Sequence, residues 1–374
     1  MKFLHLSDLH LGKRLNDVSL LEDQRHALEQ AVETAHRQQV DAVLIAGDVY
    51  QKASPPGEAM ALFNDFLTAL VDLGIKVFVI SGNHDSHLRV SYLSALVRPA
   101  GVYISEEFTG TLQQYPLNDE YGPVTVHLLP FIKPIAVRRF FPDAVIETYQ
   151  DAVAAVLAHS PVDPSRRNVL VCHQFITGSE TSDSEEHSVG GLDNIDGSLF
   201  EAFDYVALGH IHKPQKIGRD TMRYSGSLLK YSFSEANHNK GFCLVDMQEK
   251  GKIQISSVPI SPLHDVREVR GTMYDVMHMP YSEDYVRVTL TDEIIPPDAR
   301  VTLSTVFPNI MTLAVDNSKT AAPLEVLEGK SIQDKSIEEL FCDFYRLMNG
   351  DVPPSEEMLS ILREVVEEME VDAK

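Results

Sequence analysis

The segment VFVISGNHDSHLRV, from Val77 to Val90, governs the interpretation of the whole chain. It begins as an apolar run typical of a buried strand and ends abruptly in Asn83, His84 and Asp85. These side chains carry an amide, an imidazole and a carboxyl group, which suit binding and proton transfer better than packing. We therefore expect a buried strand whose carboxyl end delivers polar side chains to a functional site.

The same arrangement occurs at four other places in the first 212 residues. KFLHLS ends in Asp8-Leu9-His10, AVLIAG in Asp48, NVLVC in His173, and YVALG in His210-Ile211-His212. Because ligand sites of α/β sheets form outside the carboxyl ends of strands, we expect all five endings to meet in one crevice. In an extended chain, residues i and i+2 point the same way, so the D-x-H and H-x-H pairs are each expected to act together.

The candidate ligands offer only nitrogen and oxygen donors, without a thiolate. They are Asp8, His10, Asp48, Asn83, His173, His210 and His212. Such a mixed set suits manganese, iron or zinc better than magnesium. Two ions at the spacing of two-metal hydrolases, about 3.5 to 4 Å, need a shared carboxylate, which Asp48 is placed to supply. His84 is then free to act on a phosphate, and Asp85 to orient its neighbours or cap the following helix.

Each motif alone has an ordinary structural explanation. A D-x-H after a strand is usually a helix cap beside a surface histidine, and G-D after an apolar run is commonly a turn. The occurrence of all five motifs in this order, each at a strand end, is what favours a metal site.

The order of apolar and helical segments predicts an α/β domain followed by smaller units. Helices are expected over Leu20 to Gln39, Pro56 to Leu73 and Asp143 to His159, between strands buried on both faces. After about Met222 the pattern becomes β-rich, and SPLHDVREVRG leads into a second domain with strands flanking a short helix. Beyond a linker, two helices end the chain, the first beginning in the capping box at Ser336.

Composition limits the choice of compartment and partner. The formal net charge of −23, from 32 Lys and Arg against 55 Asp and Glu, argues against nucleic-acid binding through a broad basic surface. No apolar run approaches the ~20 residues of a membrane span, and the N-terminus lacks the features of a signal peptide. The cysteines Cys172, Cys243 and Cys342 are an odd number without a CxxC pair, so we expect a reduced, cytoplasmic protein without a membrane partner.

The motifs resemble those of the calcineurin-like metallophosphoesterase superfamily, whose pattern is D-x-H, G-D, G-N-H-[DE], H and G-H-x-H. Within it, the chain is similar to the family of bacterial SbcD nuclease subunits, the counterparts of the double-strand-break repair nuclease of archaea and eukaryotes. The stretches that carry this similarity are LHLSDLHLGKRL, DAVLIAGDVYQKASPPGEA, VISGNHDSHLRV, DYVALGHIHKPQKIG and RYSGSLLKYSFSE. They span most of the first 240 or so residues.

The resemblance implies an architecture and a set of partners. It implies a four-layer α/β/β/α nuclease domain over residues 1–265, a small α+β capping domain over 266–330, and a C-terminal helix-loop-helix over 331–374. The helices are expected to dock on the coiled coil of an SbcC-type ATPase, with two copies of the chain in a heterotetramer. The implied activity is a manganese-dependent, ATP-regulated 3′ to 5′ double-strand exonuclease with single-strand endonuclease activity, in DNA repair, recombination and replication.

The resemblance also implies roles for individual residues. One manganese ion is expected on Asp8, His10, Asp48 and His212, and the other on Asp48, Asn83, His173 and His210. His84 is the expected catalytic histidine. Archaeal relatives carry a second histidine three positions after the bridging aspartate, where this chain has Gln51. His84 is therefore expected to act alone or with Asp85.

Several alternatives stay open at this point. Lys13, Arg14, Lys52 and Arg89 follow the motifs closely and are candidate DNA contacts, or else ordinary solvated charges. The acidic loop ITGSETSDSEEHSVGG either has no role or forms a lip over the site. The apolar stripe Met358, Leu362, Val365 or Val366 and Met369 either packs on Phe341, Phe344 and Met348 of the preceding helix or binds the partner.

Two other functions compete with the nuclease. A phosphoesterase acting on small-molecule or protein phosphoesters would use the same metals and the same chemistry at phosphorus. A catalytically silent scaffold would only recruit a partner, but the intact set of candidate ligands argues against it. The matching sequence around the motifs and the C-terminal extension favour the nuclease.

Overall fold

The computed structural model describes residues 1–185, 194–318, 320, 337–349 and 352–363. The chain divides into two compact units, Met1–Val266 and Arg267–Lys374. The expected start of the C-terminal element at Ser331, the capping residue Ser336, and Val365, Val366 and Met369 lie outside the described residues.

The first sheet of the first unit has six strands in the order β14-β13-β1-β4-β5-β6. Strands β1, β4, β5 and β6 run parallel to one another, and β13 pairs antiparallel with both β1 and β14. The strands are β14 (Ile253–Pro259), β13 (Gly241–Met247), β1 (Lys2–Leu6), β4 (Ala42–Ala46), β5 (Lys76–Ile80) and β6 (Val102–Ile104). Strand β4 is apolar throughout, and β5 is apolar after Lys76, because both faces of the sheet are covered.

The second sheet also has six strands, in the order β11-β12-β10-β9-β8-β7. Its central strands β8, β9, β10 and β12 are parallel, and β7 and β11 pair antiparallel at the edges. The strands are β11 (Gln215–Ile217), β12 (Arg219–Tyr224), β10 (Tyr205–Gly209), β9 (Arg167–His173), β8 (Gly122–Leu129) and β7 (Gln113–Asp119).

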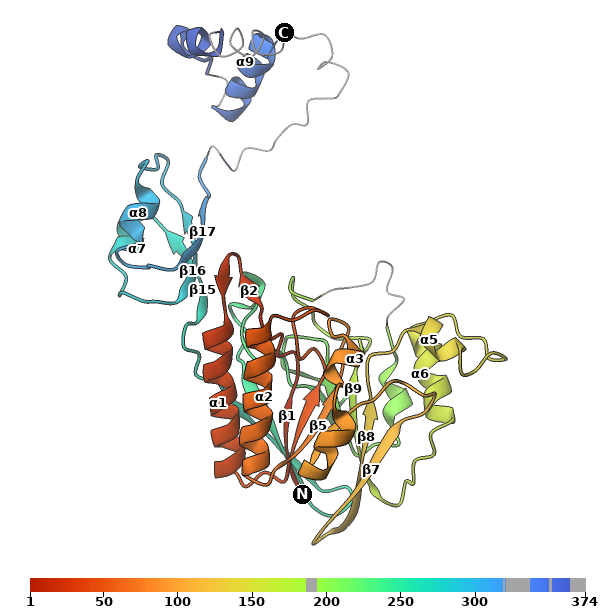
Figure 1. Ribbon diagram of the computed structural model, residues 1–374. Helices are drawn as coiled ribbons and strands as arrows, with labels where there is room; N and C mark the ends of the chain where they lie inside the picture. Colours follow the sequence, from red (N-terminus) through yellow and green to blue (C-terminus); the bar gives the residue numbers. More distant parts are fainter. Residues whose placement is uncertain (186–193, 319, 321–336, 350–351, 364–374) are drawn as a thin grey trace. The chain divides into compact units, whose positions relative to one another are not determined.

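The two sheets pack face to face, with helices outside them. One buried cluster joins Phe3, Leu44 and Phe78 of the first sheet to Val126 and Val171 of the second. Figure 1 shows α1 (Leu21–Arg37) and α2 (Gly57–Asp72) on one side of the strands and α5 (Pro134–Arg138) and α6 (Tyr149–Ala158) on the other. The unit is therefore an α/β/β/α sandwich, as predicted.

Shorter elements lie in the connections of this unit. They are β2 (Arg14–Leu15), β3 (Val18–Ser19), α3 (His87–Val90), α4 (Ser94–Val97) and the 3-10 helices η1 (Arg98–Ala100), η2 (Gly197–Phe200) and η3 (Phe233–Glu235). Cys172 lies in the buried cluster between the second sheet and α6, as expected of a small core residue.

The predicted start of the third helix at Asp143 is wrong. The helix begins only at Tyr149, because Thr148 and Asp151 form a capping box that satisfies the first free backbone amides. The other two long helices begin and end within two residues of the predicted bounds.

The second unit contains a three-stranded sheet in the order β15-β16-β17. Its elements are β15 (Val266–Gly271), α7 (Met273–Met277), β16 (Tyr285–Leu290), α8 (Ala299–Leu303), β17 (Ile310–Val315) and α9 (Ile337–Met348). Residues 356–363 are also helical. In the part of the chain that the structure describes, no helix has the length and apolar composition needed to cross a membrane.

Candidate metal centre

The five predicted strand endings meet, but they come from two sheets. Strands β1, β4 and β5 of the first sheet supply Asp8 to Asn83, and β9 and β10 of the second supply His173 to His212. Contacts join the two sides directly, for example Asp48 Oδ2 to His173 Nε2 at 3.3 Å. The crevice therefore lies where both sheets present the carboxyl ends of parallel strands.

The backbone at these endings is not extended, so the predicted reason for the pairing of residues i and i+2 is wrong. Asp8, His10 and Asp48 have φ values of 51°, 45° and 49°, and His210 has a φ of 103°. Non-glycine residues adopt this left-handed region at a cost of about 1 to 3 kcal/mol, which the surrounding structure must offset. The side chains converge because the chain turns sharply after each strand.

The glycine before His210 is required by the close approach of the two sheets. A Cβ atom at Gly209 would lie 1.8 Å from the backbone oxygen of Ala46 in β4. No shift of a flexible side chain relieves such a clash, because the opposing atom belongs to the backbone. The glycine of G-H-x-H therefore allows β10 and β4 to come close enough to share one site.

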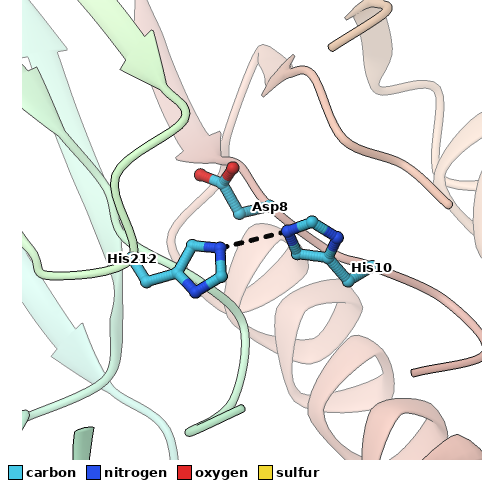
Figure 2. Close-up of side chains that lie close together, drawn as sticks. All are labelled: Asp8, His10 and His212. Atoms are coloured by element: carbon cyan, nitrogen blue, oxygen red, sulfur yellow. Dashed lines mark hydrogen bonds between the residues drawn. The ribbon is translucent and has the colours of Figure 1, made fainter. Parts of the chain in front are cut away.

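The first group of candidate ligands is Asp8, His10 and His212, whose ligand atoms all lie within 4.8 Å of one another. Figure 2 shows the imidazoles of His10 and His212 facing each other, with Nε2 atoms 3.1 Å apart and the carboxylate of Asp8 beside them. All three side chains are buried. The Nδ1 atom of His10 is buried without a hydrogen-bond partner in the described residues.

The second group surrounds Asp48 and Asn83. The amide oxygen of Asn83 lies 3.0 Å from His173 Nε2 and 3.0 Å from His210 Nδ1. Asp48 Oδ2 lies between the groups, 3.3 Å from His173 Nε2 and 3.7 Å from His10 Nε2. Asp48 therefore occupies the central position that a shared ligand needs.

His173 tests whether this donor set fits a cation. Its Nδ1 donates to the carbonyl oxygen of Ala46 at 2.7 Å, so Nε2 carries the lone pair in the neutral ring. That lone pair faces oxygen atoms of Asp48 and Asn83, which are also acceptors. Buried acceptors that face one another need a positive charge between them. The residues therefore fit a divalent cation with nitrogen and oxygen ligands.

The close packing of buried carboxylates and imidazoles also shifts their pKa values. Burial raises the pKa of Asp8 to about 6, although the nearby imidazoles of His173 and His212 oppose this. Burial acts against a charged His173, but Asp48 outweighs it and raises the pKa of His173 to about 9. The pKa of Asp48 is lowered, because attraction to the imidazoles, above all His173, exceeds the effect of burial. Cation binding to such a site is expected to displace protons.

His84 lies at the edge of the cluster. Its Nε2 is 4.0 Å from Asp48 Oδ2, and its ring packs edge-on against His10 at 4.9 Å between centroids. Its backbone amide donates to Asp48 Oδ1 at 2.9 Å. His84 is partly exposed, so its ring is accessible to a ligand in the crevice.

Of the two roles expected of Asp85, capping of the following helix is wrong, because α3 begins after Ser86 without a side-chain cap. Its carboxylate accepts hydrogen bonds from the backbone amides of Val49, Tyr50 and Gly82 at 2.9 to 3.0 Å. It therefore ties the loop after β4 to the loop after β5. Burial and the charge of Asp48 together raise the pKa of Asp85 to about 7.

Two residues that orient His212 were not predicted. His212 Nδ1 donates to the hydroxyl of Ser184 at 2.7 Å, and that hydroxyl donates to Glu235 at 2.5 Å. Glu235 is fully buried and also pairs with Lys240. Glu235 falls within a stretch that carries the family resemblance, but no sequence pattern marks Ser184. His187, in the same loop as Ser184, lies outside the described residues.

The four candidate DNA contacts follow the motifs closely in the chain. Lys13 and Lys52 lie in loops, Arg14 lies in β2 and Arg89 lies in α3. Lys13 lies 5.9 Å from the ring centroid of Tyr231, which packs against the two histidines of the first group. Arg14, Lys52 and Arg89 are exposed. The side-chain oxygen of Gln51, the residue in place of the second family histidine, is buried without a hydrogen-bond partner in the described residues.

Comparison with known proteins extends the family resemblance along the chain. The family of calcineurin-like phosphoesterases matches residues 1–214. The SbcD component of the nuclease SbcCD from Staphylococcus epidermidis is 34% identical over 359 residues, which are 93% of this chain and 93% of the relative. The chain belongs to the SbcD family of calcineurin-like phosphoesterases. The predicted family, fold class and enzyme class, a metal-dependent hydrolase of phosphoester bonds, are confirmed.

Further comparisons cover the C-terminal part and the structure. The SbcD component of the same nuclease from Staphylococcus saprophyticus is 33% identical over 368 residues, 94% of each chain. A family described as the type 5 capsule protein repressor C-terminal domain matches residues 262–349. A solved dimetal phosphatase of Danio rerio is 11% identical, covers 70% of this chain and 99% of its own, and has a TM-score of 0.40.

Proposed function

We propose that this chain is the nuclease component of a complex with an SbcC-type ATPase. The proposed activities are a manganese-dependent 3′ to 5′ double-strand exonuclease and a single-strand endonuclease, used in DNA end processing, repair and recombination. The observation that carries the proposal is the convergence of two groups of buried ligands on Asp48. The similarity to two proteins named as components of the nuclease SbcCD, over nearly the whole chain, supports the choice of DNA as substrate.

The proposed metal ligands divide into two sets that share Asp48. One set is Asp8, His10, Asp48 and His212, and the other is Asp48, Asn83, His173 and His210. When bound, two divalent cations supply positive charge that activates water and offsets the charge developing on the phosphate. Manganese is proposed because nitrogen and oxygen donors are mixed, whereas magnesium prefers oxygen ligands and water.

His84 is the proposed catalytic residue of the protein itself. It can donate a proton to the leaving oxygen or a hydrogen bond to the phosphate, because its ring lies beside the cluster and is partly exposed. The partly buried carboxylate of Asp85 is proposed to hold the two loops that carry Asp48 and His84. Gln51 cannot serve as a proton donor to a reacting oxygen, so His84 is proposed to act without a second histidine.

The C-terminal helices are the proposed docking element for the ATPase. Ile337 and Phe344 of α9 and Ile361 of residues 356–363 expose more than half of their side-chain surface. Arg363 pairs with Glu338, which joins the two helices and leaves this apolar surface available. A contact of a helix face with a coiled coil fits such a surface.

A homodimer is proposed within this complex. The segment over α3 and α4 exposes four large apolar side chains, Leu88, Tyr92, Leu93 and Leu96, with Tyr92 and Leu96 each 72% exposed. Exposed large apolar side chains this close together in the chain suit an interaction surface. DNA is proposed to approach the crevice past Lys13, Arg14, Lys52 and Arg89, which would offset the acidic net charge locally.

The proposed compartment is the cytoplasm. All three cysteines are free, and two of them are buried. Free buried cysteines persist where thiols stay reduced.

One experiment separates the nuclease from the other phosphoesterases. A blunt, end-labelled DNA duplex is incubated with the full chain, alone and with its partner ATPase, in manganese and then in magnesium. His84→Ala and an aryl phosphate ester are tested beside it. We expect manganese-dependent shortening from the 3′ end that falls by about 10²- to 10⁴-fold in His84→Ala, the usual contribution of a general acid.

Hydrolysis of the ester with intact DNA under every condition would contradict the proposal. That outcome would instead favour a phosphoesterase of small molecules or proteins.

A further inference from the structure

A cavity of about 370 Å³ lies directly beside the candidate metal centre. It reaches Asn83, and its lining includes Phe108, Phe131, Lys133, Arg139 and Phe140. The volume is at the small end of the ~300 to 1,000 Å³ range of ligand pockets. The cavity therefore has room for one planar group beside a phosphate in the crevice, and not for a large ligand.

One wall of the cavity is an aromatic ring fixed next to a candidate ligand. Phe131 stacks on the imidazole of His210 with an angle of 20° between the rings and 6.5 Å between their centroids. Its backbone amide donates to the carbonyl oxygen of Ser81 at 2.9 Å, which holds the residue between the two sheets. Phe131 is only half-buried, so part of the ring stays accessible.

The opposite charges of the cavity lining favour a nucleotide over a purely apolar ligand. Lys133 and Arg139 are exposed and have no acidic partner in the described part of the chain. The lining also includes Glu106, which pairs with Arg98, and Glu107. A carboxylate such as that of Glu107 can accept hydrogen bonds from the amino groups of bases but repels phosphate. The cations therefore suit the sugar-phosphate backbone, and the aromatic and acidic residues suit a base.

We propose that this cavity binds one unstacked nucleobase of the cleaved strand, adjacent to the scissile phosphate, by stacking on Phe131. The inference rests on the proposed nuclease function and adds a base-binding subsite to it. Aromatic side chains bind bases without regard to sequence because every base has a π face. Such a subsite requires the end of a duplex to open before cleavage.

The test maps cleavage around a missing base. A single-stranded oligonucleotide carries one abasic tetrahydrofuran unit, moved along the strand in a series of substrates, and the full chain with manganese and the ATPase cleaves each one. Product lengths give the relative rate at each linkage. We expect the linkage at one fixed offset from the abasic unit to be cut about tenfold less efficiently, through a higher KM, as loss of one stacked base predicts.

Variants of the cavity wall identify the stacking partner. Phe131→Leu is expected to raise KM about tenfold for intact DNA. It is also expected to abolish the reduced cleavage at the fixed offset from the abasic unit, whereas Phe131→Tyr keeps this reduction. Phe141→Leu is the matched control, since Phe141 is a partly buried phenylalanine nearby in the chain that does not line the cavity. Lys133→Ala is expected to weaken the binding of intact and abasic substrates equally.

Three outcomes overturn the inference, and they are distinguishable. If the wild-type chain cleaves all linkages around the abasic unit at equal rates, a base-binding subsite is excluded while the nuclease function stands. This result does not depend on the folding of any variant. If the reduced cleavage persists in Phe131→Leu, stacking on Phe131 is excluded. Absence of cleavage on every DNA substrate removes the nuclease function, and the subsite with it.

Discussion

His212 shows how the ring of one proposed metal ligand is oriented. Its Nδ1 hydrogen is committed to the hydroxyl of Ser184, which in turn donates to Glu235. This leaves Nε2 as the atom with a lone pair, facing His10 and Asp8 (Figure 2). Partners of this kind set the tautomer and the orientation of a metal-binding imidazole.

Ser184→Ala is expected to lower manganese affinity about tenfold. The hydroxyl is lost, but Glu235 remains 3.3 Å from His212 Nδ1, so the effect falls at the lower end of the ~10- to 100-fold range for such partners. Calorimetric titration of the metal-free full chain with manganese measures the change. Ser179→Ala is the control, because the Ser179 hydroxyl donates to the carbonyl oxygen of Ile176 and also bonds to Tyr224, and neither residue is a candidate metal ligand. Equal affinities of wild type and Ser184→Ala would show that Glu235 alone orients the ring.

At the residue scale, the sequence predicts which side chains come together better than it predicts the residues that orient them. The meeting of the five motifs could be predicted because apolar runs mark the ends of the strands that carry them. Ser184 carries no such signal, since it is one of several serines in an acidic loop and contacts His212 only through tertiary packing. Asp85 was expected either to orient its neighbours or to cap the next helix; its carboxylate accepts from backbone amides 35 and 36 residues away, which no local pattern in the sequence indicates.

Among the elements, Arg167 connects the start of β9 to the hairpin of β7 and β8. Its guanidinium, 3% exposed, pairs with Asp119 and also donates to the carbonyl oxygens of Gly122 and Gln248. Burial opposes the charge on Asp119, but hydrogen bonds from Arg167 and from the amino group of Met1 outweigh it and lower the pKa of Asp119 to about 2. This pair holds the edge of the second sheet.

Asp119→Asn is expected to reduce stability at neutral pH and to flatten its acid dependence. The folded pKa lies below the unfolded value of 3.8, so the stabilisation is complete above pH 3.8 and is lost as pH falls toward 2. At about 1.4 kcal/mol per pKa unit, the loss at pH 7 is about 2 kcal/mol. Urea unfolding between pH 2 and pH 7 measures it, with the exposed Asp72→Asn as control. Parallel pH profiles for wild type and Asp119→Asn would contradict the assignment.

Helices and strands were predicted correctly where the local sequence pattern agrees with the tertiary packing. The apolar runs that became β1, β4, β5, β9 and β10 are buried on both faces, so their pattern alone marks them. Residues 143–148 were misassigned to a helix, because the local apolar pattern does not show that Thr148 starts it. The division of the strands between two sheets was predicted from the family resemblance, because the sequence of a single strand does not indicate which strands it pairs with.

For the whole molecule, the assignment of the C-terminal helices and the candidate ligands to different units leads to a test. A chain ending before Ser331 keeps every candidate ligand and both six-stranded sheets. We expect it to retain metal-dependent hydrolysis of an aryl phosphate ester while losing co-purification with the ATPase. Pull-down from a strain that expresses both proteins, together with the ester assay, measures the two effects.

A substituted full-length chain provides the matched control. Phe344→Glu places a charge in the exposed apolar surface of α9 without shortening the chain. It is expected to weaken the association in the same direction as the truncation. If the shortened chain still binds the ATPase, the docking element lies elsewhere, and the domain limit at residue 331 has no functional meaning.

The supply of ligands from two sheets has a consequence for the cell during synthesis of the protein. On the proposed assignment, Asp8 to Asn83 leave the ribosome well before His173 to His212, and neither part alone holds a complete set. Hydrolytic activity is therefore expected only when both sheets have formed and packed together. On this assignment, a nascent or partly unfolded copy of the chain lacks a complete set of proposed ligands, and we expect it to have no hydrolytic activity.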